Sequence, residues 1–96
     1  MEGIEILKII KRNGGRISGS YARGEETPMS DYDFYIPENK WDKLVKDVPK
    51  NFDSCICGHI AWRSTDIGMI EASMMFDKQK TDIKVRDIQG IEFKTW

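Results

Sequence analysis

The sequence has little of what marks a disulfide-linked, membrane-spanning or nucleic-acid-binding protein. It contains only two cysteines among 96 residues, and its charged side chains nearly cancel, to a net charge of −1. No apolar run approaches the roughly 20 residues that cross a bilayer. A balanced charge gives no general attraction to nucleic acid. We therefore expect neither a nucleic acid nor a membrane as a partner.

The two cysteines are separated by one residue, as Cys55 and Cys57. On a strand this spacing places both thiols on the same face, where such close neighbours rarely form a disulfide. A structural zinc site needs more ligands than His59 alone can add. Since free cysteine is often buried, we expect two buried thiols.

Length and composition fit one compact domain over residues 1–96. Hydrophobic residues make up 40% of the chain and charged residues 32%, which is ordinary for a globular protein. The first residues, Met1-Glu2-Gly3, do not resemble a signal peptide, so a cytoplasmic location is expected.

The first half of the chain predicts the order helix, strand, strand, helix. Apolar residues from Ile4 to Ile10 recur at spacings of three and four, which predicts an amphipathic helix that ends at Asn13-Gly14-Gly15. Residues 16–19 predict a short extended run and residues 20–25 a helical turn. A strand is expected over residues 31–36, and after Pro37 a second helix over residues 38–48.

The second half predicts mainly strands. Extended segments are expected over residues 54–63, 69–76, 82–88 and 91–96, with turns over residues 64–68, 77–81 and 89–90.

Two short segments suggest a site for phosphate and a divalent metal. Asp31 and Asp33 stand at positions i and i+2 of the predicted strand, so they project from one face, and their oxygens suit Mg²⁺. Upstream, Gly19-Ser20 forms a turn in which the backbone can approach a phosphate closely. Taken alone, each segment is more often a solvated pair or a helix cap. Their combination in this order indicates a site.

Here the sequence resembles the nucleotidyltransferase superfamily that includes DNA polymerase β, in particular its minimal members. The signature is Gly-Ser, often followed by Ala-Arg-Gly, and then Ser-Asp-x-Asp on the next strand. The matching residues are Gly19, Ser20, Ala22, Arg23, Gly24, Ser30, Asp31 and Asp33. The resemblance implies an α+β fold, with helices packed on a mixed β-sheet, of the polymerase β-like nucleotidyltransferase type.

The resemblance also implies a reaction. A nucleoside monophosphate would pass from a nucleoside triphosphate to a hydroxyl of a protein or small molecule, with Mg²⁺ as cofactor. Asp31 and Asp33 would hold the metal, and Gly19 and Ser20 would bind phosphates. Arg23 and Ser30 are further phosphate-binding candidates. Minimal relatives often pair with a helical protein in toxin–antitoxin modules, so a helical partner or a homodimer is expected.

The family usually adds a third carboxylate from a later strand. Glu71 is the first candidate, both as a catalytic residue and as a metal ligand, because it is an acid within an apolar strand, where an unpaired charge is costly. Asp82 is the second candidate. An outward position on a half-exposed strand would explain Glu71 equally well. Glutamate also departs from the commonest pattern, which has aspartate, and its side chain is longer.

The alternative function is a catalytically weak or inactive domain of the same fold, which binds a nucleotide or a protein as a regulator or inhibitor. Its small size and unassigned third carboxylate favour this alternative, whereas the intact Asp31 and Asp33 count against it. Tyr21 or Trp62 could stack on a base, although each is more typical of a core or rim position. His59 is expected to be structural.

Overall fold

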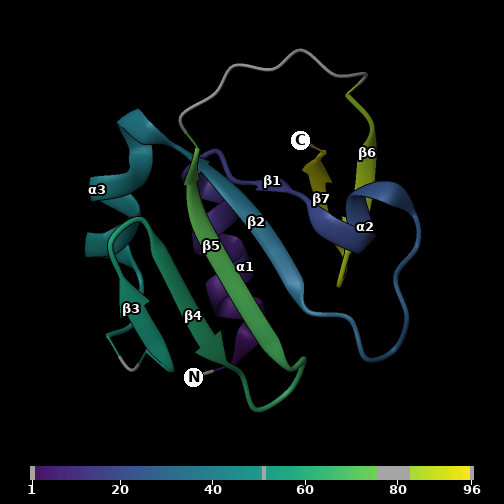
Figure 1. The fold of residues 1–96 in the computed structure, drawn as a ribbon, viewed down its shortest axis with the longest axis horizontal. Coiled ribbons are helices and arrows are strands. Elements are labelled where there is room, and N and C mark those ends of the chain that lie inside the picture. The colour runs from purple at the N-terminus through teal and green to yellow at the C-terminus, as the bar shows by residue number, and fades with distance from the viewer. Residues whose placement is uncertain (1, 51, 76–82, 96) are drawn as a thin grey trace.

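The computed structural model describes residues 2–50, 52–75 and 83–95 of the chain (Figure 1). The helices and strands of these residues, in chain order, are α1 (Gly3–Arg12), β1 (Arg16–Ile17), α2 (Gly19–Arg23), β2 (Tyr32–Pro37), α3 (Glu38–Asp47), β3 (Ser54–Ile56), β4 (His59–Arg63), β5 (Met69–Met75), β6 (Val85–Ile88) and β7 (Ile91–Lys94).

Five of these strands form one mixed sheet in the order β1-β2-β5-β4-β3. The central strands β2 and β5 are parallel, and the other neighbouring pairs are antiparallel. Strands β6 and β7 form a separate hairpin, which meets β1 through a parallel bridge between Ile17 and Thr95. The predicted α+β fold, with helices packed on a mixed sheet, is confirmed.

The core lies between one face of this sheet and the helices α1 and α3. Burial alternates along β2, where Tyr32, Phe34 and Ile36 are buried and the residues between them are partly exposed. In Figure 1, α1 runs behind β2 and β5. Its spacing of apolar residues is that of an amphipathic helix, and it buries Ile6, Leu7 and Ile10 on one face.

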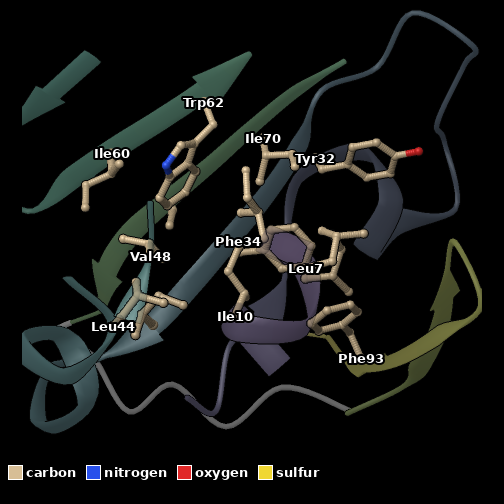
Figure 2. Close-up of a cluster of buried hydrophobic side chains, with 14 of the residues drawn as sticks. Leu7, Ile10, Tyr32, Phe34, Leu44, Val48, Ile60, Trp62, Ile70 and Phe93 are labelled. Atoms are coloured by element: carbon tan, nitrogen blue, oxygen red, sulfur yellow. The ribbon is translucent and has the colours of Figure 1, made fainter. Parts of the chain in front are cut away.

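The two ends of the core are filled by different parts of the chain (Figure 2). At one end the rings of Phe34 and Phe93 lie 4.8 Å apart, which attaches the β6–β7 hairpin to the sheet. At the other end Leu44 of α3 packs near Trp62 of β4. Each fully buried side chain of this size contributes about 1.5–3 kcal/mol to stability.

The segment over residues 54–63 is a hairpin and not the single strand that the alternation predicted. Strands β3 and β4 pair antiparallel, and Gly58 turns the chain between them with a φ of +75°. Glycine adopts this left-handed conformation without the steric cost of a side chain. The apolar residues on both sides of the turn are what made the segment read as one strand.

The expectation of two buried thiols is wrong, because Cys55 and Cys57 are both exposed. Strand β3 is three residues long and lies at the edge of the sheet, so neither of its faces is covered, and Ile56 is 69% exposed. Cys57 falls in the turn after the strand.

Two smaller differences concern β2. The strand begins at Tyr32, one residue later than predicted, which leaves Asp31 in the preceding loop. It also includes Pro37, which is in register with Met75 at the end of β5. None of the helices in the described part of the chain has the length and apolar character needed to cross a membrane.

A contact distant in sequence fixes the start of α1. The backbone N–H of Gly3 donates to Oδ1 of Asp66, in the turn between β4 and β5, at 2.7 Å. The first N–H groups of a helix have no partner within the helix, so this carboxylate acts as a cap. The hydrogen bond from Gly3 is also the main cause that lowers the pKa of Asp66.

We expect Asp66→Asn to lower the free energy of unfolding near neutral pH, because an amide oxygen is a weaker acceptor than a carboxylate. Since the folded-state pKa of Asp66 lies below its unfolded-state value, the stabilisation is complete above the unfolded value. It disappears as the pH falls through the folded value. Urea unfolding of both proteins, at neutral pH and below both pKa values, measures the difference. Asp42→Asn, an exposed position on α3, is the control. An equal effect of Asp66→Asn at both pH values would contradict the prediction.

Candidate active site

The face of the sheet opposite the core carries a pair of carboxylates. Because β2 and β5 are parallel, Asp33 lies directly beside Glu71 in the register. Both side chains are partly buried, and a side-chain hydrogen bond joins them. Such a bond between two carboxyl groups needs a proton on one of them. The sheet therefore brings together two acids that stand 38 positions apart in the sequence.

Asp33 titrates well above the ordinary range of an aspartate. Burial is the largest cause, and together with the hydrogen bond to Glu71 and the negative charges of Glu71 and Asp31 it raises the pKa of Asp33 to about 6, whereas the charge of His59 opposes the shift. Accumulated negative charge in a partly dehydrated place is costly. It is also the condition under which a bound cation is favoured.

His59 reaches the same pair from a third strand. Its Nε2 lies 3.2 Å from Oε1 of Glu71, and the two side chains are 31% and 28% exposed. In the pairing of β4 with β5, His59 lies opposite Ser73 and Ala61 opposite Glu71, so these side chains share one face of the sheet. A row of His59, Glu71 and Asp33 thus crosses three neighbouring strands.

The turn at Ser18 and Gly19 is held against Asp33 from the other side. The backbone N–H of Ser18 donates to the carbonyl oxygen of Asp33 at 2.8 Å, and the hydroxyl of Ser18 donates to the same oxygen at 3.1 Å. Gly19 has a φ of +65°, and a Cβ atom there would lie 2.7 Å from Oδ2 of Asp33. Only glycine lets the backbone come this close to the carboxylate.

These elements enclose a cleft of about 400 Å³. The lining residues come from the turn before α2, from α2 itself, from β2 and from β5: Ser18, Gly19, Ala22, Arg23, Asp33, Phe34, Tyr35, Glu71 and Ser73. The cleft is polar, with paired acids on its floor and the Gly19 turn at its side.

A family model for the nucleotidyltransferase domain matches residues 4–91. The chain belongs to this family. The search of curated proteins and the search of solved structures each gave no match. Family membership supports nucleotidyl transfer as the general activity, and the match spans all the residues that line the cleft.

The structure brings the predicted site residues only partly together. Gly19, Arg23, Asp33 and Glu71 line the cleft, whereas Ser20, Ser30 and Asp31 do not. Asp31 is exposed in the loop before β2, although its charge acts on Asp33. The second candidate for the third carboxylate, Asp82, lies outside the described residues.

Two of the predicted phosphate-binding side chains have protein partners. Nε of Arg23 lies 3.0 Å from Oε2 of Glu25 in an exposed ion pair. The hydroxyl of Ser30 accepts a hydrogen bond from the backbone N–H of Thr27 at 2.9 Å, which stabilises the loop before the strand. Exposed ion pairs are weak, so Arg23 can exchange Glu25 for a phosphate at little cost.

The aromatic candidates for base stacking are largely used within the protein. Trp62 is 1% exposed in the core. The rings of Tyr21 and Tyr32 stack at 4.8 Å. Burial, with the hydrogen bond to Tyr32 next in importance, raises the pKa of Tyr21 to about 12. One face of the Tyr21 ring is thus taken by Tyr32.

Three residues near the acids were missed by sequence reasoning or assigned elsewhere. His59 was expected to be structural, whereas Ser73 and Tyr35 were not considered. Tyr35 and Ser73 each follow a predicted acid by two positions on the same strand, so the period of two was a usable signal. No such signal pointed to His59, because its place depends on the β3–β4 hairpin.

The donor set fits Mg²⁺. Asp33 and Glu71 offer hard oxygen ligands side by side, and the mutual hydrogen bond shows that they lie within reach of one ion. Among the described residues, no group of three or more His, Cys, Asp or Glu side chains is arranged to hold a metal by itself. Mg²⁺ in proteins is commonly held by one or two carboxylates together with substrate phosphates, so this is no obstacle.

We expect Gly19→Ala to destabilise the protein by more than the strain of a positive φ alone. That strain costs roughly 1–2 kcal/mol for alanine. At Gly19 the new methyl group would also displace the Asp33 carboxylate, since the two would be 2.7 Å apart. Gly90→Ala is the matched control, because Gly90 has a φ of +83° and no atom within 4 Å of its Cβ position. Equal losses in urea unfolding would show that the contact with Asp33 is unimportant.

Proposed function

We propose that this protein is a Mg²⁺-dependent nucleotidyltransferase that moves a nucleoside monophosphate from a nucleoside triphosphate to a hydroxyl of a protein or small molecule. The observation that supports this proposal best is the Asp33–Glu71 pair, at the floor of a cleft bordered by the Gly19 turn. We further propose a cytoplasmic location and a helical partner protein, as in a toxin–antitoxin pair, or a second copy of the chain.

In this proposal the carboxylates of Asp33 and Glu71 hold Mg²⁺, with Asp31 entering as a third ligand from the adjacent loop. When bound, the ion neutralises phosphate charge and polarises the phosphorus that is attacked. The backbone at Gly19 and the hydroxyl of Ser20 bind phosphate oxygens, assisted by Arg23 and by Ser30. Glu71 was the first candidate for the third carboxylate, and its contact with Asp33 supports that choice.

The transfer balances as one substitution at phosphorus. The acceptor oxygen forms a bond to the α-phosphorus, the bond from that phosphorus to the bridging oxygen breaks, and pyrophosphate leaves with the electron pair. The hydroxyl proton passes to Glu71. Positioning and electrostatic stabilisation provide most of the acceleration in such reactions.

A nucleotide-binding domain with weak or no catalysis is the second candidate. It is favoured by the exposed position of Asp31 in the loop before β2. A binding domain would keep the cleft and the phosphate contacts but would transfer nothing.

The experiment incubates the protein with Mg²⁺ and each labelled nucleoside triphosphate, with and without candidate acceptors. We expect label transfer by the wild-type protein, and a loss of more than about 100-fold in Asp31→Asn/Asp33→Asn and in Glu71→Gln, because several kcal/mol of transition-state stabilisation depend on the metal. Asp53→Asn, on the far edge of the sheet, is the control for a lost negative charge.

Two results would contradict the proposal that the protein is an enzyme. Equal transfer by the wild-type protein and the double variant would show that the carboxylates are not used. Nucleotide binding without transfer to any acceptor would favour the second candidate.

A further inference from the structure

His59 is the single histidine of the chain. Its Nε2 lies 3.2 Å from Oε1 of Glu71, on the face of the sheet that carries the cleft, and away from the buried core. The row from β4 through β5 to β2 ends at Asp33, which Glu71 contacts on its other side. Glu71 is therefore held between a nitrogen donor and a second acid.

We propose that His59 is a positioning residue, which fixes the Glu71 carboxylate for metal binding. This inference rests on the proposed function, because it concerns the same metal site. The Nε2 atom of His59 lies 3.2 Å from Oε1 of Glu71 and so faces one of the roughly four acceptor positions of that carboxylate. The others stay available, to Asp33 in the metal-free protein and to Mg²⁺ when the ion is bound. Partners of this kind behind a metal ligand orient it and raise its affinity for the ion.

The need for such a residue follows from the length of glutamate. Aspartate is the commoner third acid in this type of site, and glutamate has one more rotatable bond, which must be frozen when the metal binds. A partner that holds Glu71 in the free protein removes part of that cost beforehand. His59 thereby compensates for the extra methylene group of Glu71.

The proposed role does not depend on the charge of His59. At the 3.2 Å that separates Nε2 from Oε1, a neutral imidazole with its proton on Nε2 can donate to the carboxylate of Glu71, as the charged form can. A glutamine at position 59 offers an amide N–H at a similar reach. Alanine offers none, so the pair of variants separates the donor from the mere filling of space.

The simpler interpretation is a cross-strand pair that only adds stability. The chain provides a comparison, because Arg63 of the same strand pairs with Asp53 at 3.8 Å, with side chains 73% and 43% exposed. Exposed pairs of that kind contribute little. The His59 contact is shorter, less exposed and adjacent to the cleft, and its acid is also in contact with Asp33.

The test measures Mn²⁺ binding to the wild-type protein, His59→Ala, His59→Gln and the control Arg63→Ala, by the loss of the free-ion signal in electron paramagnetic resonance. We expect His59→Ala to weaken Mn²⁺ binding about 10-fold or more, as is typical for such partners. His59→Gln should stay close to wild type, and Arg63→Ala should equal it. Thermal unfolding by circular dichroism confirms that each variant is folded at the temperature used.

A second measurement uses transfer by the same proteins. The Mg²⁺ concentration for half-maximal rate should rise in His59→Ala by about the same factor, while the KM for the acceptor stays unchanged. A loss of stability alone would move neither quantity in folded protein.

The outcomes separate the two proposals. Wild-type binding of Mn²⁺ with no change in His59→Ala overturns the positioning role and leaves the metal site intact. An equal loss in both variants at position 59 also overturns it, because the donor would then not matter. Absence of Mn²⁺ binding by the wild-type protein overturns the metal site itself and, with it, the role of His59.

Discussion

The parallel pairing of β2 with β5 determines both faces of the central sheet. Six residue pairs, from Tyr32 with Ile70 to Pro37 with Met75, set one register. On one face this register stacks Phe34 beside Ala72 in the core, and on the other it sets Asp33 beside Glu71. A slip of β2 by one residue would move all of its side chains to the opposite face, placing Asp33 in the core and the ring of Phe34 in the cleft. The apolar face therefore specifies the position of the polar one.

The packed core on the other face of the sheet offsets the unfavourable free energy of placing Asp33 and Glu71 side by side. Burial and the contact with Glu71 raise the pKa of Asp33 to about 6, which means that the fold disfavours the charged form of this side chain. The buried face beneath them contains Phe34, Ile70 and Ala72, each with 1% or less of its surface exposed. A tightly packed core of this kind deforms little, so the two acids stay side by side when both are charged as well as when they share a proton. Functional sites commonly retain such unfavourable arrangements.

Local patterns in the sequence predicted the helices and the faces of the strands, because these features depend on residues that are close in the sequence. The period of two put Asp31 and Asp33 on one face, and the periods of three and four defined α1 and α3. The contact of Asp33 with Glu71 could be proposed only from family resemblance, because a parallel register is set by the crossover through α3 and the β3–β4 hairpin. That hairpin was itself missed, since Cys57-Gly58 was read as part of a strand. For this reason the sequence did not predict that His59 lies beside Glu71, and the prediction that both cysteines are buried was wrong.

Glutamate at position 71 and histidine at position 59 are best understood together. The alternation of β5 puts residue 71 on the polar face whatever acid stands there, but a longer side chain samples more conformations. In the antiparallel pairing of β4 with β5, His59 lies two residues along β4 from Ala61, the partner of Glu71, so the imidazole reaches the carboxylate diagonally. Diagonal neighbours of this kind are within reach of each other when their side chains are long. The residue directly opposite Glu71 on β4 is Ala61, whose small side chain leaves room for the imidazole of His59 to reach the carboxylate.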